Sequence, residues 1–141
     1  MLRSVVAVLS GFLAVAVLSL GTDQILHVLN VYPPWGEPMW SPWLNLLALG
    51  YRTVYTVFGG YLTAALAPRR PMRHVAIVGM IGLVISTLGA AVAISVADLG
   101  PAWYPVLLAA LSFPSVWIGG LWQQRGRSAH QTSRTLRAAS R

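Results

Sequence analysis

Four long apolar stretches, separated by short polar or proline-rich segments, make up most of this 141-residue chain. They cover about residues 4–30, 43–67, 75–97 and 101–122. Each has about the 20 residues that an α-helix needs to cross roughly 30 Å of hydrocarbon. The pattern predicts an all-α protein, a transmembrane four-helix bundle with short loops.

Proline and glycine mark the ends of these stretches. Segment 31–42 carries five helix-breaking residues, Pro33, Pro34, Gly36, Pro38 and Pro42, so we expect a loop there. Pro68 closes the second stretch, and Pro101 is placed to begin the fourth helix. Pro114 falls in the middle of that helix and predicts a kink.

Composition places the protein in the membrane. The chain is 56% hydrophobic and 9% charged, whereas an average soluble domain has about 25% charged residues. Residues 123–141 depart from this pattern, because they are mainly Gln, Ser, Thr, Ala and Arg. We therefore divide the chain into a transmembrane domain, 1–122, and a basic cytoplasmic tail, 123–141, which we expect to be disordered.

The arginines predict the orientation of the helices. If the helices alternate in direction, nine of the ten basic residues fall at one end of the bundle: Arg3, Arg69, Arg70, Arg73, Arg125, Arg127, Arg134, Arg137 and Arg141. By the positive-inside rule, both termini then lie in the cytoplasm. We expect these basic segments to contact anionic lipid headgroups, which accounts for the charge without a nucleic-acid partner. A cleaved secretory signal is the alternative for the first stretch, although its apolar run exceeds the usual 7–15 residues of such signals.

Arg52 is the arginine that this orientation leaves unexplained. Counted from Trp43, it lies about nine residues, or roughly 13 Å, into the second helix. An unpaired arginine at that depth costs about 2.5–3.5 kcal/mol or more. Asp23 lies about seven residues, or roughly 10 Å, before Asn30 at the end of the first helix. We therefore predict that Asp23 and Arg52 pair across neighbouring antiparallel helices.

Further polar residues extend this pair into a predicted network. His27 shares a helix face with Asp23, and Tyr55 shares one with Arg52. We predict one buried polar network of Asp23, His27, Arg52 and Tyr55. Two roles stay open for it: fixing the first helix against the second, as buried ion pairs can do, or binding an anion or a proton, because ionisable groups within membranes are commonly functional.

Two other groups of residues are candidates for contacts. Trp35, Trp40 and Trp43 in or beside the proline-rich loop are expected at the headgroup layer, as a possible ligand or interface loop. Small residues on the second and third helices predict close helix packing, with a dimer interface as the alternative. These are Gly59, Gly60, Gly82, Ser86 and Ala90.

Motifs of enzymes and metal sites are missing from the sequence. The chain has no cysteine, no glycine-rich phosphate loop and no His-Glu zinc motif. Ser86 or Ser95 with His27 is a conceivable catalytic pair, but serines in membrane helices usually bond to backbone carbonyls or neighbouring helices. We assign no catalytic residue, no metal site and no cofactor.

Several segments resemble an uncharacterised group of small four-span bacterial inner-membrane proteins. They are Leu20–Asp23 with His27, Tyr51–Tyr55 running into Gly59–Ala64, and Ala67–His74. The resemblance covers nearly all of the four spans. It implies a multi-pass protein of the bacterial inner (plasma) membrane and no particular activity.

The proline-rich loop carries a second resemblance. Tyr32–Trp35, followed by Pro38–Trp43, is similar to the Pro/Trp-rich first loop of the tryptophan-rich sensory (translocator) proteins, which bind porphyrins and sterols. Those proteins have five spans, whereas four are predicted here, so the resemblance extends to this loop alone.

Two functions follow as hypotheses. The first is a small accessory or interaction protein, whose partner is another membrane protein or a second copy of itself. The second is a ligand-handling protein, either an oligomeric transporter-like protein or a binder of a hydrophobic or porphyrin-like molecule, which uses the Asp23, His27, Arg52 and Tyr55 network. The sequence does not decide between them.

Overall fold

The computed structural model describes residues 2–97 and 99–139, with the backbone alone for residues 96–97 and 129–139. Within that part the chain is helical and contains no strand. Its elements are α1 (Leu2–Val28), α2 (Pro42–Leu66), α3 (Pro71–Val92), the single π-helical turn η1 (Ala93–Ala97) and α4 (Trp103–Ala139).

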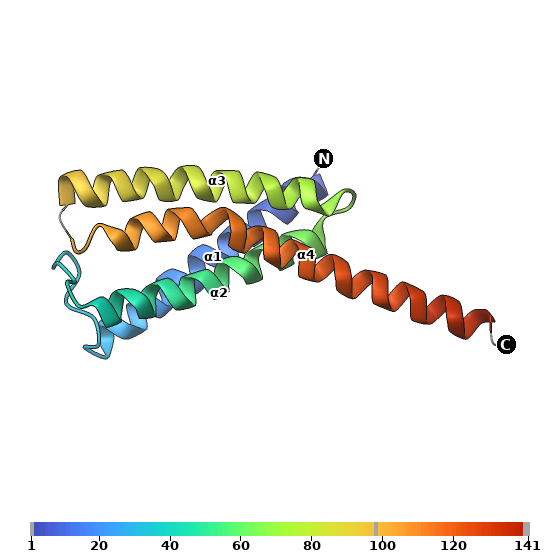
Figure 1. The fold of residues 1–141 in the computed structure, drawn as a ribbon, viewed down its shortest axis with the longest axis horizontal. Helices are drawn as coiled ribbons and strands as arrows, with labels where there is room; N and C mark the ends of the chain where they lie inside the picture. Colours follow the sequence, from blue (N-terminus) through green and yellow to red (C-terminus); the bar gives the residue numbers. More distant parts are fainter. Residues whose placement is uncertain (1, 98, 140–141) are drawn as a thin grey trace.

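The four α-helices lie side by side and alternate in direction (Figure 1). The 29–41 loop and the 99–102 connection lie at one end of the bundle, which we call the loop end. The start of α1, the 67–70 turn and the second half of α4 lie toward the other end, which we call the terminal end. α2 packs against α1 and α4, and α3 packs mainly against α4. The predicted all-α helical bundle is confirmed.

Three helices are long and apolar enough to cross a membrane: Leu2–Val28, Pro71–Ser95 and Trp103–Ser128. α2 has a similar length of 25 residues but is more polar, since Asn45, Arg52, Thr53 and Thr56 interrupt its apolar sequence. The exposed surface is rich in large apolar side chains, including Val17 and Leu88. Small residues occupy much of the interior, as membrane helix bundles favour.

Close helix contacts centre on glycines of α2. A Cβ atom on Gly60 would overlap the Val116 backbone of α4, and one on Gly59 would come within 2.9 Å of the Gly11 carbonyl oxygen of α1. Ala64 of α2 completes this contact region with Val116 and with Val75 of α3. The backbones of α1, α2 and α4 approach one another closely because these positions carry no side chain or a short one.

α4 is much longer than the predicted fourth span. It continues beyond Trp122 to Ala139, where we expected a disordered tail. Helix propagation is easier than nucleation, and the Gln, Arg and Ala residues of this segment have high helix propensity. Pro114 lies within α4, and the second half of the helix runs in a different direction from the first (Figure 1).

Candidate functional site

The structure pairs Asp23 of α1 with Arg52 of α2. Arg52 Nη2 donates to Asp23 Oδ2 in an ion pair, and the Tyr51 hydroxyl donates to Asp23 Oδ1. Asp23 is buried, with 3% of its surface exposed. Both carboxylate oxygens are therefore satisfied by donors from one turn of α2.

Tyr51 and Tyr32 extend the network from this carboxylate to the loop. The Tyr32 hydroxyl lies 3.4 Å from the Tyr51 hydroxyl and 3.4 Å from the Leu44 carbonyl oxygen. Burial raises the pKa of the Tyr32 hydroxyl above its ordinary value of 10.0. Neither tyrosine was among the predicted network residues. Tyr51 directly precedes Arg52 in the sequence, and this adjacency is the signal that could have found it.

Tyr55 lies beside the ion pair but bonds elsewhere. Its hydroxyl is 3.0 Å from Thr22 Oγ1, so this bond is a second link between α1 and α2. Its ring centroid is 5.8 Å from that of Tyr51. The hydrogen bonds of Tyr55 and of Asp23 thus form two sets, which the ring contact between Tyr51 and Tyr55 joins.

His27 contacts the aromatic loop instead of forming a hydrogen bond with Asp23. Its ring centroid lies 4.0 Å from Trp35 and 5.5 Å from Tyr32. Trp35 Nε1 in turn donates to Gln24 Oε1 at 3.2 Å. His27 Nδ1 is buried and has no hydrogen-bond partner within the described part of the chain.

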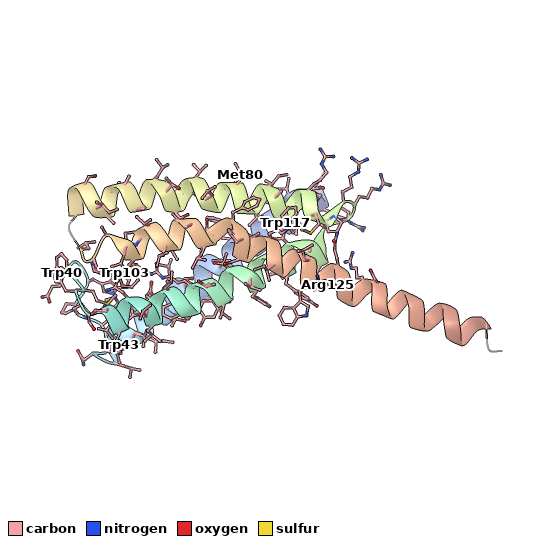
Figure 2. The ribbon with its side chains drawn as sticks, in the orientation of Figure 1. Trp40, Trp43, Met80, Trp103, Trp117 and Arg125 are labelled. Atoms are coloured by element: carbon pink, nitrogen blue, oxygen red, sulfur yellow. The ribbon has the colours of Figure 1, made fainter. Side chains whose placement is uncertain are left out.

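The three tryptophans of the predicted contact loop have different positions. Trp35 lies against His27 and remains 61% exposed as a residue. Trp40 and Trp43 are also exposed, and Figure 2 shows them at the loop end with Trp103, whereas Arg125 lies toward the other end. Trp35 is the one of the three that lines the pocket described next.

A cavity of about 260 Å³ lies between the 29–41 loop and the ends of the helices, and we call it the loop pocket. Its polar lining includes Asp23, His27, Glu37 and Arg52. The loop above it is fixed to α2, because Asn45 Nδ2 donates to the carbonyl oxygens of Met39 at 2.8 Å and Ser41 at 2.9 Å.

The same loop is joined to the connection between η1 and α4. The Met39 backbone N–H donates to the Leu99 carbonyl oxygen at 2.7 Å. Gly100 lies against this contact with φ 155°, and a Cβ atom there would come 2.6 Å from the Met39 carbonyl oxygen. The loop pocket is therefore covered by two chain segments that hold each other.

A second cavity, of about 310 Å³, lies between the four helices and is called here the helix cavity. It is lined mainly by apolar side chains of α1, α3 and α4, together with one turn of α2 that includes Arg52. Nothing in the sequence pattern predicted either cavity, because a cavity depends on how far apart the helix backbones lie.

The predicted packing residues of α3 lie beside this cavity rather than in a tight helix contact. Gly82 and Ser86 line the helix cavity, whereas Ala90 is buried elsewhere on α3. A Cβ atom on Gly82 would meet no other element's atoms within 4 Å among the described residues. A larger side chain at Gly82 would therefore meet open space rather than a neighbouring helix. Gly82 and Ser86 thus border a space instead of admitting a second backbone.

The arrangement provides hydrogen-bond donors inside an apolar bundle. Arg52 lines both cavities, and its Nε has no hydrogen-bond partner within residues 2–97 and 99–139. In the same residues, no group of three His, Asp or Glu side chains could hold a metal ion. The lining of the loop pocket combines hydrogen-bonding side chains with the aromatic rings of Tyr32, Trp35 and Tyr104.

Comparisons with protein families, with characterised proteins and with solved structures find no match to this chain.

Proposed function

We propose that this is a four-span protein of a bacterial inner membrane, with both termini in the cytoplasm. Three helices meet the length and hydropathy needed to cross a membrane. α2 supports a fourth span because it runs along the bundle antiparallel to α1, in the same direction as α4, and has 25 residues (Figure 1). Its most polar groups point to other helices, since Arg52 contacts Asp23 and Tyr55 contacts Thr22. The terminal end then faces the cytoplasm with its arginines.

We propose that this protein binds a small molecule in the loop pocket. The observation that carries the proposal is the position of the Asp23–Arg52 pair, which lines a cavity of about 260 Å³ instead of being packed on all sides. A concave site with convergent polar groups among aromatic residues is typical of ligand sites.

The test is to identify what co-purifies with the protein. The full chain is extracted with its surrounding lipid in polymer-bounded nanodiscs, and bound small molecules are measured by native mass spectrometry. Trp35→Ala should lose the bound molecule because Trp35 lines the pocket. Trp43→Ala is the matched control, since Trp43 is at the same end and exposed but does not line the pocket.

Equal occupancy in the two tryptophan variants would refute the proposed site. The accessory or interaction role expected from the sequence stays a prediction. It would become the better interpretation if a protein partner or a second copy of the chain co-purified stoichiometrically and no small molecule did.

A further inference from the structure

The helix cavity contains a buried hydroxyl group that the described part of the chain does not satisfy. Ser115 of α4 lines this cavity and is 3% exposed as a residue. Its hydroxyl makes no hydrogen bond within residues 2–97 and 99–139. The unpartnered side-chain atoms that the protein encloses there are His27 Nδ1, Arg52 Nε and Gln123 Oε1. Ser115 Oγ is not one of them, so it keeps a surface toward the cavity.

The other hydroxyl groups of this cavity differ from that of Ser115. Four of them donate to a carbonyl oxygen of their own helix at 2.5–2.7 Å, and these belong to Thr53, Thr56, Ser86 and Ser112. Ser19 of α1 also lines the cavity but is only partly buried. A buried hydroxyl without a partner is unfavourable. The Ser115 hydroxyl is therefore available to an acceptor from outside the chain.

Arg52 supplies a second donor at a similar depth. It lines the cavity, and its side chain is 29% exposed. α2 begins at Pro42 and α4 at Trp103, and both starts lie at the loop end. Arg52 therefore lies about 15 Å along α2, and Ser115 lies about 18 Å along α4. Since α2 and α4 run in the same direction, the two donors face one level of the cavity.

The remaining lining of the helix cavity is apolar, and its described residues include no carboxylate. Asp23, the partner of Arg52, lines the loop pocket and not this cavity. A cationic group in the cavity would therefore be buried beside Arg52 without a carboxylate of the same lining to pair with. An oxygen acceptor would instead meet the two donors, Arg52 and Ser115.

The helix cavity also reaches the outer surface of the bundle. Leu20 of α1 and Ile85 of α3 line it, and they are 60% and 51% exposed. The cavity therefore meets the lipid-facing surface between α1 and α3. Apolar cavities take up hydrocarbon, so a molecule dissolved in the bilayer can enter from the side.

From these observations we propose that the helix cavity is a second binding site, which takes from the bilayer a hydrocarbon molecule with the acceptor oxygen of a carboxylate or a carbonyl group. The oxygen accepts hydrogen bonds from Ser115 and Arg52, and the hydrocarbon part contacts the apolar lining. The inference does not rest on the proposed function of the loop pocket, because Ser115 and the apolar lining lie outside that pocket.

The test uses four probes that share a hydrocarbon chain with a photoreactive diazirine: decanoate, methyl decanoate, decane and decylammonium. The full-length protein is reconstituted in nanodiscs of ether-linked phosphatidylcholine, which has no carbonyl group to compete, at a pH where both charged probes are ionised. Peptide mass spectrometry gives the ratio of labelling at Ile85, which lines the cavity, to labelling at Leu88, which is exposed and does not. This ratio cancels differences in how much of each probe enters the bilayer.

We expect the ratio to be about fivefold higher for decanoate or methyl decanoate than for decane and decylammonium, because one hydrogen bond contributes about 1 kcal/mol. A high ratio for decanoate alone identifies a carboxylate ligand. A high ratio that includes methyl decanoate identifies a carbonyl oxygen as sufficient.

Two serine variants on α4 test the hydrogen bond. Ser115→Ala removes the free donor, so the preference for oxygen-bearing probes should fall about fivefold. Ser112→Ala is the matched control, because Ser112 lines the same cavity but its hydroxyl already donates to the Ala109 carbonyl oxygen. This control should keep the preference of the unmodified protein.

Two glycine variants on α3 test the cavity itself. Gly82→Leu adds a side chain to open space in the cavity, so the fold should be retained and the ratio for the oxygen-bearing probes should fall about fivefold. Gly89→Leu is the control, because Gly89 also has open space around it but does not line the cavity. Its ratio should equal that of the unmodified protein.

Other results would overturn the inference. Equal ratios for the four probes, or the highest ratio for decylammonium, would contradict an acceptor oxygen. Equal preference in Ser115→Ala and Ser112→Ala would show that water or the helix itself satisfies the Ser115 hydroxyl. If Trp35→Ala loses its co-purified molecule while Ser115→Ala and Gly82→Leu leave the labelling unchanged, the proposed function of the loop pocket stands and the second site fails.

Discussion

Asp23 receives two donors of different chemistry, a guanidinium from Arg52 and a phenol from Tyr51. Because these residues are consecutive on α2, one turn of helix satisfies both oxygens of a carboxylate on α1. A buried charge that loses its partner is strongly destabilising, whereas replacing both partners by apolar residues is often tolerated. Substitutions of Asp23 and Arg52 should therefore have non-additive effects on the free energy of unfolding.

We expect Arg52→Leu to destabilise the protein by about 3 kcal/mol, since Asp23 is left buried beside Tyr51 without its counter-charge. The double variant Asp23→Leu with Arg52→Leu should recover most of that loss. Equilibrium unfolding in mixed detergent micelles, followed by circular dichroism, measures the free energies of unfolding of the native protein, of Asp23→Leu, of Arg52→Leu and of the double variant. Additive effects of the two substitutions would show that the pair does not act as a unit.

The helices approach one another most closely where α2 carries glycine. Gly59 faces α1 and Gly60 faces α4, so two adjacent residues serve two different helix contacts. On α3, Gly79 packs closely against Phe113 of α4, whereas Gly82 leaves room for the helix cavity. Glycine thus allows close helix packing at positions 59 and 60 of α2 and leaves an open space at position 82 of α3.

Gly60→Leu should destabilise the bundle by about 3 kcal/mol or more, because its side chain would overlap the Val116 backbone of α4. Gly50→Leu is the control on the same helix, since a Cβ atom there has open space within 4 Å among the described residues. Both changes remove a glycine from a helix, so their difference in thermal stability reports the packing alone. Similar melting temperatures would contradict the close contact.

The sequence alone predicted the helices and the Asp23–Arg52 pair, but it did not predict the roles of Tyr51 and Trp35 or the two cavities. The long apolar stretches and the prolines between them located the helices. Counting residues from the helix ends paired Asp23 with Arg52, because the depth of each residue depends only on its distance along its own helix. The roles of Tyr51 and Trp35 depend on how one helix is rotated against another and on how the 29–41 loop folds back. The cavities depend on the spacing between backbones, as the contrast between Gly60 and Gly82 illustrates.

At the scale of the whole molecule, the bundle has large apolar side chains outside and small or polar ones inside. This distribution is the reverse of a soluble protein's and fits a hydrocarbon solvent. Polar groups of α2 are directed at α1 and at the cavities, so its lower hydropathy reflects its neighbours within the bundle. α2 is therefore the helix whose passage through the membrane most needs a direct test.

Two single-cysteine variants test that passage, and the native chain supplies no background because it has no cysteine. Glu37→Cys precedes α2 and Arg69→Cys follows it, and both positions are exposed. If α2 spans the membrane with the proposed orientation, a membrane-impermeant maleimide should label the first variant in intact spheroplasts and the second only after permeabilisation. Labelling of both variants from the same side would exclude the crossing.

The length of α4 determines how far its basic residues lie from the membrane surface. Its 37 residues correspond to about 55 Å of helix, well beyond roughly 30 Å of hydrocarbon. With α4 crossing the bilayer up to Trp122, the backbone of residue 134 lies about 18 Å further along the axis. Electrostatic attraction is screened over about 8 Å at physiological ionic strength. If α4 continues along the membrane normal, the basic positions near the bundle can hold the protein to lipid headgroups, whereas those toward Ala139 lie in water beyond the range of that attraction.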